Sequence, residues 1–396
     1  MKSYKGEFIP FGKEKMKIVF PRMETTEFHN AYDGGCKYIQ QFGEELVKRG
    51  HEVEVVTTRL RDFPFIRKWN SKGIKYTFLN PRYTGNKLIP FNMFYKLRFS
   101  WNLKKYLKNK DFDILHNSEA FAYFYLMNKP KKKVVFQSWA LEPFYGDECQ
   151  SQKGLRKLYV KLFLQLPWKS CIKRSDCITI DKEFQISNLL NLGVSRNKID
   201  FIPNGIPFKK IQKLKHKDKR KELGLKKSDL VLLSVSQLVE DKGIEEIIKG
   251  FRLAKKKIKN LKLILIGKGV LENKIKTDKD IIHLKNIPEE DLFNYHFSSD
   301  IFINATRTNN LMLSIQEAMA CGLPVVSSAQ PFLIKDGING YVVGINNYKG
   351  LANGIIKMSK GNLKKMGKES IKLAKEYDWD NVVDSAERIY RRLLNE

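Results

Sequence analysis

Two adjacent glycines near the N-terminus have the position of a phosphate-binding turn. Gly34 and Gly35 follow Asp33, between an apolar strand candidate, KIVF, and the helical pattern CKYIQQFGEELVKRG. A strand, a tight turn and a helix start together form an anion site, because unpaired backbone N–H groups and the helix dipole point at the ligand. A pair of glycines also makes an ordinary turn, so the pattern by itself leaves both interpretations open.

A histidine at the end of a predicted strand is a candidate for proton transfer. The segment DILHNSEA places His116 at the carboxyl end of that strand, the edge where open α/β sheets bind ligands. At this edge it can contact an acceptor or carry a proton. The alternative is a histidine that is only packed or hydrogen-bonded.

Acidic residues in two further segments fit either ligand binding or helix capping. Ser314 and Glu317 have the S-x-x-E spacing of a capping box. Asp378 and Asp380 form an Asp-x-Asp, which in another setting holds a divalent metal on a diphosphate. Because a capping role in the terminal helix explains both aspartates, we expect no metal site.

The elements that must position these residues alternate between short apolar strands and amphipathic helices, as in parallel sheets covered by crossover helices. The alternation occurs twice. The first series of predicted strands lies at residues 17–20, 51–57, 113–116, 133–138, 177–180 and 198–202. The second series lies at residues 229–236, 261–267, 281–284, 301–305 and 324–328.

Two domains are therefore expected, since 396 residues exceed the size that one hydrophobic core usually serves. A lysine-rich stretch from Asn204 to Gly224 has little to bury, and we interpret it as the hinge. The predicted division is a basic extension at residues 1–15, an N-terminal domain at 16–208, a C-terminal domain at 209–376 and a terminal helix at 377–396.

Charge is the most unusual bulk property of the chain. It has 73 Lys and Arg against 43 Asp and Glu, a formal charge of +30, and residues 1–210 carry 39 of the basic and 20 of the acidic side chains. This excess favours polyanionic partners, although a solvated lysine-rich surface gives the same sum. No nucleic-acid-binding motif accompanies the charge, so we expect no specific nucleic-acid partner.

Apolar runs all fall short of the roughly 20 residues that span a bilayer. The five cysteines contain no C-x-x-C pair, which argues against a disulfide framework and a zinc site. These features predict a cytoplasmic protein.

The segment NNLMLSIQEAMACGLPVV at residues 309–326 resembles the sugar-donor motif of retaining glycosyltransferases of family 4. Other stretches resemble the same family in the same order: GGCKYIQQFGEELVKRGHEVEVVT, RSDCITIDKEFQISNLLNLGVSRNKIDFIPNGI, SVSQLVEDKGIEEIIKGF, LILIGKG and YDWDNVVDSAERIYRRLL. The resemblance covers residues 16–396. It implies an α/β fold of the GT-B type, with two Rossmann-like parallel-sheet domains facing a central cleft and a C-terminal helix that crosses back to the N-terminal domain.

The resemblance implies that the C-terminal domain binds a nucleotide-sugar donor. In the family, two acidic residues eight positions apart flank the donor; here Glu317 is the second, on the ribose, and Asn309 replaces the first. Asn309 can hydrogen-bond sugar hydroxyls but supplies no negative charge to an oxocarbenium-like transition state. The neighbouring donor residues are Asn310, Leu313 and Ser314, with backbone amides from Leu313 onward facing the diphosphate.

The family also places an Arg and a Lys five residues apart to neutralise the donor phosphates. Lys242 is present, but Gln237 occupies the arginine position. One cation instead of two weakens leaving-group stabilisation unless another basic residue contributes. Gly34, Gly35 and Gly267, the last in LILIGKG, complete the expected donor site.

Acceptor binding is implied for the N-terminal domain, with His116, Glu119 and Trp139 as candidate residues. Family members often have a histidine where this chain has Ser118 and another where it has Trp139. Acceptor chemistry is therefore the least transferable part of the resemblance. The candidate catalytic residues are Lys242, Asn309, Glu317 and His116.

Two segments, at residues 88–110 and 153–174, combine basic residues with large apolar ones. Either can lie in a membrane interface, with aromatic rings at headgroup depth and lysines on anionic lipid, or can pack on its own sheet. The charge excess of the N-terminal half favours peripheral contact with the inner face of a membrane, which suits a lipid-linked acceptor.

The expected function is a retaining transfer of a sugar from a UDP- or GDP-sugar to a glycan, lipid-linked or other cell-envelope acceptor. The resemblance implies that the departing phosphate helps to remove the acceptor proton, without a tightly bound cofactor or metal. An alternative, motivated by Asn309 and Gln237, is a weak or inactive homologue that binds nucleotide or serves as a scaffold.

Overall fold

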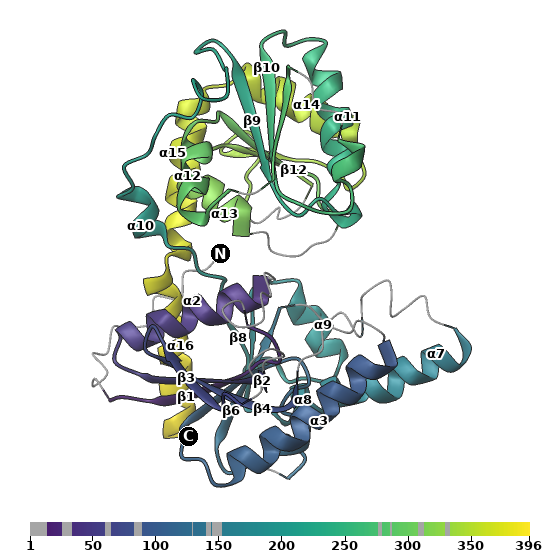
Figure 1. Ribbon diagram of the computed structural model, residues 1–396, viewed down its shortest axis with the longest axis vertical. Helices are drawn as coiled ribbons and strands as arrows, with labels where there is room; N and C mark the ends of the chain where they lie inside the picture. Colours follow the sequence, from purple (N-terminus) through teal and green to yellow (C-terminus); the bar gives the residue numbers. More distant parts are fainter. Residues whose placement is uncertain are drawn as a thin grey trace. The chain divides into compact units, whose positions relative to one another are not determined.

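The computed structural model describes residues 14–25, 34–59, 65–82, 89–128, 130–139, 144, 153–275, 279–285, 287–307, 313–328 and 333–396. Asn309 and Asn310 lie outside these ranges. The chain forms two compact units (Figure 1). The first comprises Met1–Ile202 and Val383–Glu396, and the second comprises Pro203–Val382.

The first unit contains an eight-stranded sheet in the order β3-β4-β2-β1-β5-β6-β7-β8. Its strands are β1 (Lys17–Pro21), β2 (Glu52–Arg59), β3 (Lys68–Ser71), β4 (Ile74–Arg82), β5 (Ile114–Ser118), β6 (Lys133–Ser138), β7 (Cys177–Ile180) and β8 (Ile199–Phe201). All neighbours pair in parallel except β3 and β4, which form an antiparallel hairpin. Its helical elements are α2 (Gly34–Lys48), α3 (Ile89–Lys108), α4 (Tyr123–Leu126), α7 (Gly154–Tyr159), the π-helical η1 (Val160–Gln165), α8 (Leu166–Arg174), α9 (Gln185–Asn191) and the 3₁₀ turn η2 (Arg196–Lys198).

The second unit contains a six-stranded, fully parallel sheet in the order β11-β10-β9-β12-β13-β14. Its strands are β9 (Leu230–Val235), β10 (Leu261–Ile266), β11 (Ile281–Leu284), β12 (Ile301–Asn304), β13 (Val325–Ser327) and β14 (Gly340–Val342). The helical elements are α10 (Phe208–Gln212), η3 (Glu240–Lys242), α11 (Ile244–Lys255), η4 (Glu272–Lys274), α12 (Glu289–Phe297), α13 (Leu313–Ala320), α14 (Tyr348–Ser359), α15 (Leu363–Ala374) and η5 (Lys375–Tyr377). The predicted fold class, two Rossmann-like parallel-sheet domains, is confirmed.

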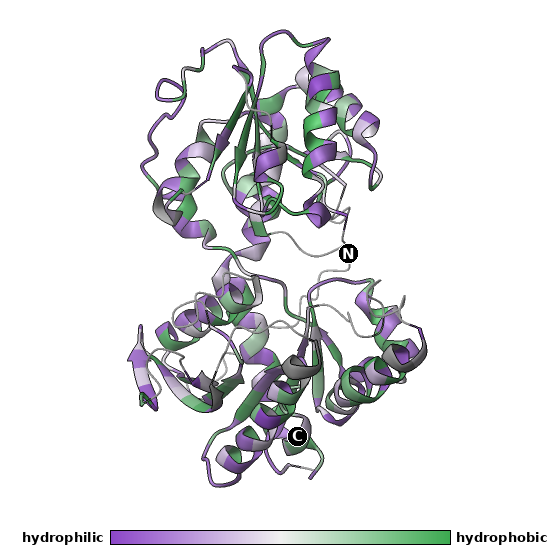
Figure 2. Ribbon diagram, turned by 45° about the vertical axis from the view of Figure 1, so that its right-hand side comes forward, coloured by the Kyte–Doolittle hydropathy of each residue, from purple (hydrophilic) through white to green (hydrophobic). Residues whose placement is uncertain are grey.

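Both faces of the second sheet are buried, which explains the continuous apolar runs in its sequence. Val231 and Leu233 of β9 pack in one core with α10, α12 and α13, whereas Leu232, between them, packs in another core with α11 and α14. Successive side chains of a strand point to opposite faces, so a strand covered on both sides is apolar at every position. Figure 2 accordingly shows the strands of this unit largely in the hydrophobic colour.

The stretch predicted as a bare hinge is packed on the second unit. Ile206 and Ile211 are fully buried within a core of that unit, and the Ile206 N–H donates to the Tyr377 carbonyl at 2.9 Å. Gly205 allows this approach, because a Cβ there would lie 2.3 Å from the Trp379 ring. The apolar residues between the lysines are therefore buried in this core, whereas the sequence suggested that the stretch buries little.

The C-terminal helix, α16 (Trp379–Asn395), ends in the first unit. Its buried residues Val383, Ala386, Tyr390 and Leu393 recur at three- and four-residue spacing, which is one face of a helix. Glu387 pairs with His51 at 2.8 Å on the same side of the first unit. The terminal helix therefore contributes to the core of the N-terminal domain.

Candidate functional site

Strand order in the second unit changes direction between β9 and β12. From β9 the chain proceeds outward to β10 and β11, and β12, β13 and β14 then fill the other side. At such a point the loops after the two central strands separate, and their carboxyl ends border a crevice where open α/β sheets bind ligands. The loop from β9 to α11 carries Lys242, and the segment after β12 leads to α13.

Lys242 ends the short 3₁₀ turn η3, directly before α11. The next residue, Gly243, has a φ of 63°, and a Cβ on it would lie 2.0 Å from the Ala305 carbonyl oxygen. Only glycine fits, so the backbone places Lys242 firmly beside the end of β12. Burial lowers the pKa of Lys242, and the Asp241 carboxylate partly opposes this effect. When an anion binds beside it, the charged form of such a desolvated ammonium is stabilised.

Gln237 and Gly267 follow the adjacent strands β9 and β10. Gly267 has a φ of 147°, and a Cβ on it would lie 1.9 Å from the Ser236 carbonyl oxygen. Gln237, the residue after Ser236, is exposed. The structure therefore brings these two predicted donor residues to one edge of the sheet, with the Gly267 carbonyl bonded to Nε2 of His283 at 2.9 Å.

Helix α13 begins at Leu313, so Leu313 and Ser314 both lie in its first turn. In the part of the chain that the structure describes, the buried Ser314 hydroxyl has no hydrogen-bond partner, and it therefore does not form the capping box that its spacing with Glu317 suggested. The amide groups of this first turn point along the helix axis and provide the partial positive charge of a helix N-terminus.

Glu317 lies one turn further along α13 and is 7% exposed. Burial lowers the pKa of His296 in α12, and the Glu317 carboxylate opposes that shift, which places the two groups near each other. Burial also raises the pKa of the Cys321 thiol, with Glu317 adding to the effect. Glu317 is thus a carboxylate in a low-dielectric setting, where hydrogen bonds from ligand hydroxyls are stronger than in water.

In the first unit, Gly34 and Gly35 are the first two residues of α2. The sequence predicted a glycine turn ahead of this helix, whereas the structure makes the glycines its first turn. The helix N-terminus follows β1, next to the point where strand order reverses between β1 and β5. The first N–H groups of a helix have no acceptor within the helix, so this N-terminus has the partial positive charge that favours an anion.

His116 lies in β5 and is 3% exposed. Its Nδ1 is 2.5 Å from the Tyr390 hydroxyl, and its Nε2 is 3.2 Å from Oε1 of Gln137. Burial lowers the pKa of His116 to about 4, opposed by the bond to Gln137, so the ring is neutral at pH 7. Both nitrogens have protein partners, and contact with an acceptor stays a prediction.

Glu119 and Trp139 are brought together through Arg22, a residue that sequence reasoning missed. Nη1 of Arg22 bonds Oε1 of Glu119 at 3.2 Å, and the guanidinium lies 5.5 Å from the centre of the Trp139 ring. Lys96 of α3 bonds the other carboxylate oxygen of Glu119 at 2.8 Å. Arg22 follows β1 just as Glu119 follows β5, so the strand-end criterion that singled out His116 also applies to it.

Glu119 has a φ of 56°, a left-handed conformation that is unusual for a residue with a side chain. Its two ion pairs hold it there, and such strain is found at ligand sites more often than elsewhere.

A buried ion pair, Asp181 and Lys182, follows β7 at the same edge of the first sheet. Both residues are at most 3% exposed, and their charged groups are 3.8 Å apart. Nζ of Lys182 donates to the Trp139 carbonyl at 3.3 Å. Burial raises the pKa of Asp181 to about 6 although Lys182 opposes it. Neither residue stands out in the sequence, because a single acid–base dipeptide has no spacing pattern.

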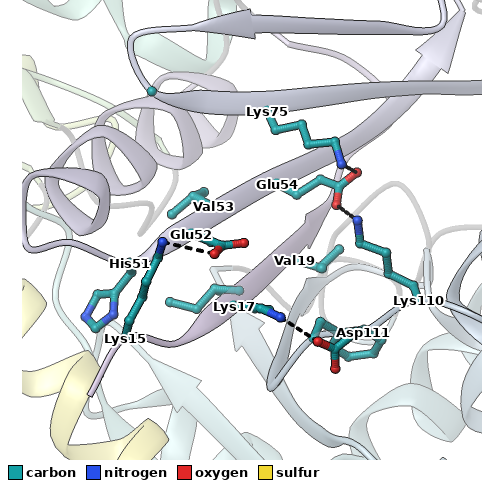
Figure 3. A pocket seen from close by; sticks show the side chains of 13 residues that line it. Lys15, Lys17, Val19, His51, Glu52, Val53, Glu54, Lys75, Lys110 and Asp111 are labelled. Carbon is teal, nitrogen blue, oxygen red and sulfur yellow. Dashed lines mark hydrogen bonds and ion pairs between the residues drawn. The ribbon is translucent and has the colours of Figure 1, made fainter.

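A pocket of about 300 Å³ opens at the opposite, amino-terminal edge of the first sheet (Figure 3). Its four lysines each have a carboxylate partner: Lys15 with Glu52, Lys17 with Asp111, and Lys75 and Lys110 with Glu54. None of the residues predicted for the site lines it, and its paired charges offer little attraction to an ionic ligand.

Two family models match the chain, Glycosyltransferase Family 4 over residues 32–210 and Glycosyl transferases group 1 over residues 215–376. An uncharacterised glycosyltransferase of Methanocaldococcus jannaschii is 26% identical over 359 residues, covering 84% of this chain and 89% of that protein. The UDP-Gal:alpha-D-GlcNAc-diphosphoundecaprenol alpha-1,3-galactosyltransferase of Escherichia coli is 24% identical over 273 residues, 65% of this chain and 69% of its own. Sucrose-phosphate synthase from Thermosynechococcus elongatus has the same fold, with a TM-score of 0.76, 19% identity, and coverage of 96% of this chain and 100% of that one.

Proposed function

Since the chain belongs to glycosyltransferase family 4, with the GT-B architecture and nucleotide-sugar dependence of that group, we propose that it moves a sugar from a UDP- or GDP-sugar to a glycan or lipid-linked cell-envelope acceptor with retention of configuration. The E. coli relative, by its name, uses UDP-galactose and a diphosphoundecaprenol-linked acceptor. That pairing motivates both halves of the proposal.

The observation that carries it is the carboxyl edge of the second sheet, where Lys242, Gly267 and the N-terminus of α13 follow the neighbouring strands β9, β10 and β12. In our proposal the diphosphate contacts Lys242 and the first amides of α13, while Glu317 accepts hydrogen bonds from the ribose. We propose that Asn309 contacts the sugar and that Asn310 and Ser314 bind the donor; Asn309 and Asn310 lie outside the described residues.

The catalytic task proposed for the protein is positioning and charge stabilisation. The departing phosphate takes the acceptor proton on the face from which it leaves, so no protein base is needed, nor a tightly bound cofactor or metal. The low pKa of His116, about 4, suits this scheme, because so weak a base does not compete for that proton. Glu119 and Trp139, joined by Arg22, are the proposed acceptor contacts.

A lipid-linked acceptor requires the enzyme to approach a membrane, and we propose peripheral contact through the helical stretch formed by α7, η1 and α8. Leu158, Leu162 and Leu166 recur every four residues and are 50%, 44% and 48% exposed, which places an apolar row on one helix face. Lys157, Lys161 and Lys169 are exposed beside it. We call these six residues the leucine row; its lysines complement anionic headgroups, and its leucines enter the interface. None of the helices within the described ranges has the length and hydropathy of a bilayer-spanning segment.

The direct test is release of nucleoside diphosphate across a panel of UDP- and GDP-sugars with lipid-linked and glycan acceptors. The proposal predicts turnover with at least one pair, and product analysis by NMR should show the anomeric configuration of the donor. Tight nucleotide binding without turnover on any pair would instead favour the inactive homologue that Asn309 and Gln237 suggest.

A further inference from the structure

Arg307 makes three hydrogen bonds to the elements that carry Lys242. Its backbone N–H donates to the Asp241 carbonyl at 2.8 Å, Nη1 to Oε1 of Glu240 at 2.9 Å, and Nη2 to Oε1 of Glu246 at 2.8 Å. Glu240 and Asp241 belong to the turn η3, and Glu246 lies in the first turn of α11. Arg307, in the segment after β12, is therefore hydrogen-bonded to both η3 and α11, the two elements that follow β9.

The neighbouring backbone strengthens this connection. The Thr306 hydroxyl donates to the same Asp241 carbonyl at 3.1 Å. Gly243 packs its Cα against the Ala305 carbonyl so closely that no side chain fits between them. Several contacts thus join the turn before α11 to the end of β12, and loss of Arg307 would loosen the turn that carries Lys242.

Arg307 also balances charge beside the proposed diphosphate. Glu240 and Glu246 precede and follow Lys242 in the chain, and both carboxylates bond the Arg307 guanidinium. Without Arg307, two uncompensated carboxylates on either side of Lys242 in the chain would repel a diphosphate bound there. The Glu246 side chain is only 12% exposed, so water screens it poorly.

We infer that Arg307 is a positioning residue of the donor site, which fixes the turn carrying Lys242 and neutralises the two carboxylates that flank it. The inference rests on the proposed function, because it needs a diphosphate at Lys242. The inference also concerns Gln237, which stands where the family resemblance implies an arginine. Arg307 would lower the electrostatic cost of phosphate binding without contacting the phosphates.

The test is the affinity of the full chain for UDP, GDP and ADP, measured by titration calorimetry at low salt. Arg307→Gln should weaken binding of the preferred nucleotide about tenfold, a typical size for coupled neighbours. Glu240→Gln in the Arg307→Gln background should restore part of the loss, because the carboxylate left without its partner is removed. Glu240→Gln alone removes the charge but keeps a side-chain oxygen that can accept the bond from Arg307, so the affinity should stay equal or rise slightly. The Glu240 side chain is 80% exposed, so folding should stay intact.

Arg220→Gln is the matched control. Arg220 bonds Asp300 at 2.7 Å just before β12, at the opposite end of the strand from Arg307. Its loss should lower the melting temperature without changing nucleotide affinity.

The outcomes separate the two levels of the account. A wild-type chain that binds none of the three nucleotides contradicts the proposed function itself. If Lys242→Gln weakens binding but Arg307→Gln binds with wild-type affinity, only the inference about Arg307 is overturned. No recovery in the double variant, or weaker binding by Glu240→Gln alone, overturns the neutralising role.

Discussion

The hydroxyl of Tyr390 lies 2.5 Å from Nδ1 of His116 and connects the C-terminal helix to β5 in the interior of the first unit. The rings of Phe20 and Phe42 pack against the same imidazole at 5.0 Å and 5.8 Å. The last helix is therefore anchored by a buried polar contact as well as by its apolar face. His116 lies two residues before the end of β5, and Glu119, a proposed acceptor contact, directly follows that strand.

Tyr390→Phe should destabilise the protein by about 1–3 kcal/mol, because it leaves a buried ring nitrogen without its partner. Urea unfolding followed by circular dichroism measures the change. Arg388→Gln is a suitable control, since Arg388 makes solvent-exposed hydrogen bonds to Asp384 and Ser385 of the same helix. An unchanged unfolding midpoint for Tyr390→Phe would mean that the short contact contributes nothing.

The neutral His116 should make stability depend on pH in a defined window. Its folded pKa of about 4 lies below the usual 6.5, so the unfolded chain binds more protons between these values. This contribution is therefore complete above pH 6.5 and is lost as pH falls toward 4, by at most about 3 kcal/mol. Asp181, whose folded pKa of about 6 is raised, acts in the opposite direction between pH 6 and 3.8.

Comparing the wild type with His116→Gln separates these effects, because Asp181 is common to both. The wild type should lose more stability than the variant between pH 6.5 and 4.5. Parallel stability curves would show that His116 is not held neutral by the fold.

Most of the sheet could be predicted from the sequence, because strands buried on both faces are apolar at every position. The predicted strands at residues 133–138 and 281–284 match β6 and β11 as observed. The hairpin β3–β4 was missed, since β3 (KWNS) has only the half-exposed Trp69 as an apolar residue and the apolar residues of β4's first half (Ile74, Tyr76 and Phe78) alternate with Lys75 and Thr77. The turn at Lys72 and Gly73, both with positive φ, was the available sign of a hairpin.

The candidate site was predictable where a motif of the family resemblance marks the residue, as for Lys242 and Gly267, which the structure places after β9 and β10. It was not predictable where the role depends on a partner distant in sequence. Arg307 and Glu240 are 67 positions apart, and Arg22 and Glu119 are 97 apart. No spacing rule connects such pairs, and only the strand order brings them together.

Leu162→Glu should weaken binding to vesicles of phosphatidylcholine with phosphatidylglycerol, because it places a charge within the leucine row. The side chain of Leu162 is 44% exposed, so folding should be unaffected. Ile338→Glu, at a position 48% exposed in the second unit, is the matched control and should sediment with vesicles like the wild type. Equal sedimentation of all three proteins would contradict membrane contact through this row, and wild-type binding to pure phosphatidylcholine would contradict the role of its lysines.

Glu317→Gln should weaken UDP or GDP binding about tenfold or more while leaving the weaker binding of inorganic pyrophosphate unchanged, because the carboxylate is proposed to contact only the ribose. Displacement titration with the two ligands measures both. A loss of pyrophosphate affinity as large as that for the nucleotide would place Glu317 on the phosphates or show that α13 has moved.

The central claim, that the second unit binds the nucleoside diphosphate of the donor at Lys242, is tested most directly by titrating the wild type, Lys242→Gln and Lys249→Gln with UDP, GDP and ADP. Lys249 is the matched control, since its side chain is 58% exposed on the same helix that follows Lys242. We predict that at least one nucleotide binds, that Lys242→Gln weakens it about tenfold or more, and that Lys249→Gln has no effect. Absence of binding by the wild type, or equal affinities for all three proteins, would contradict the account.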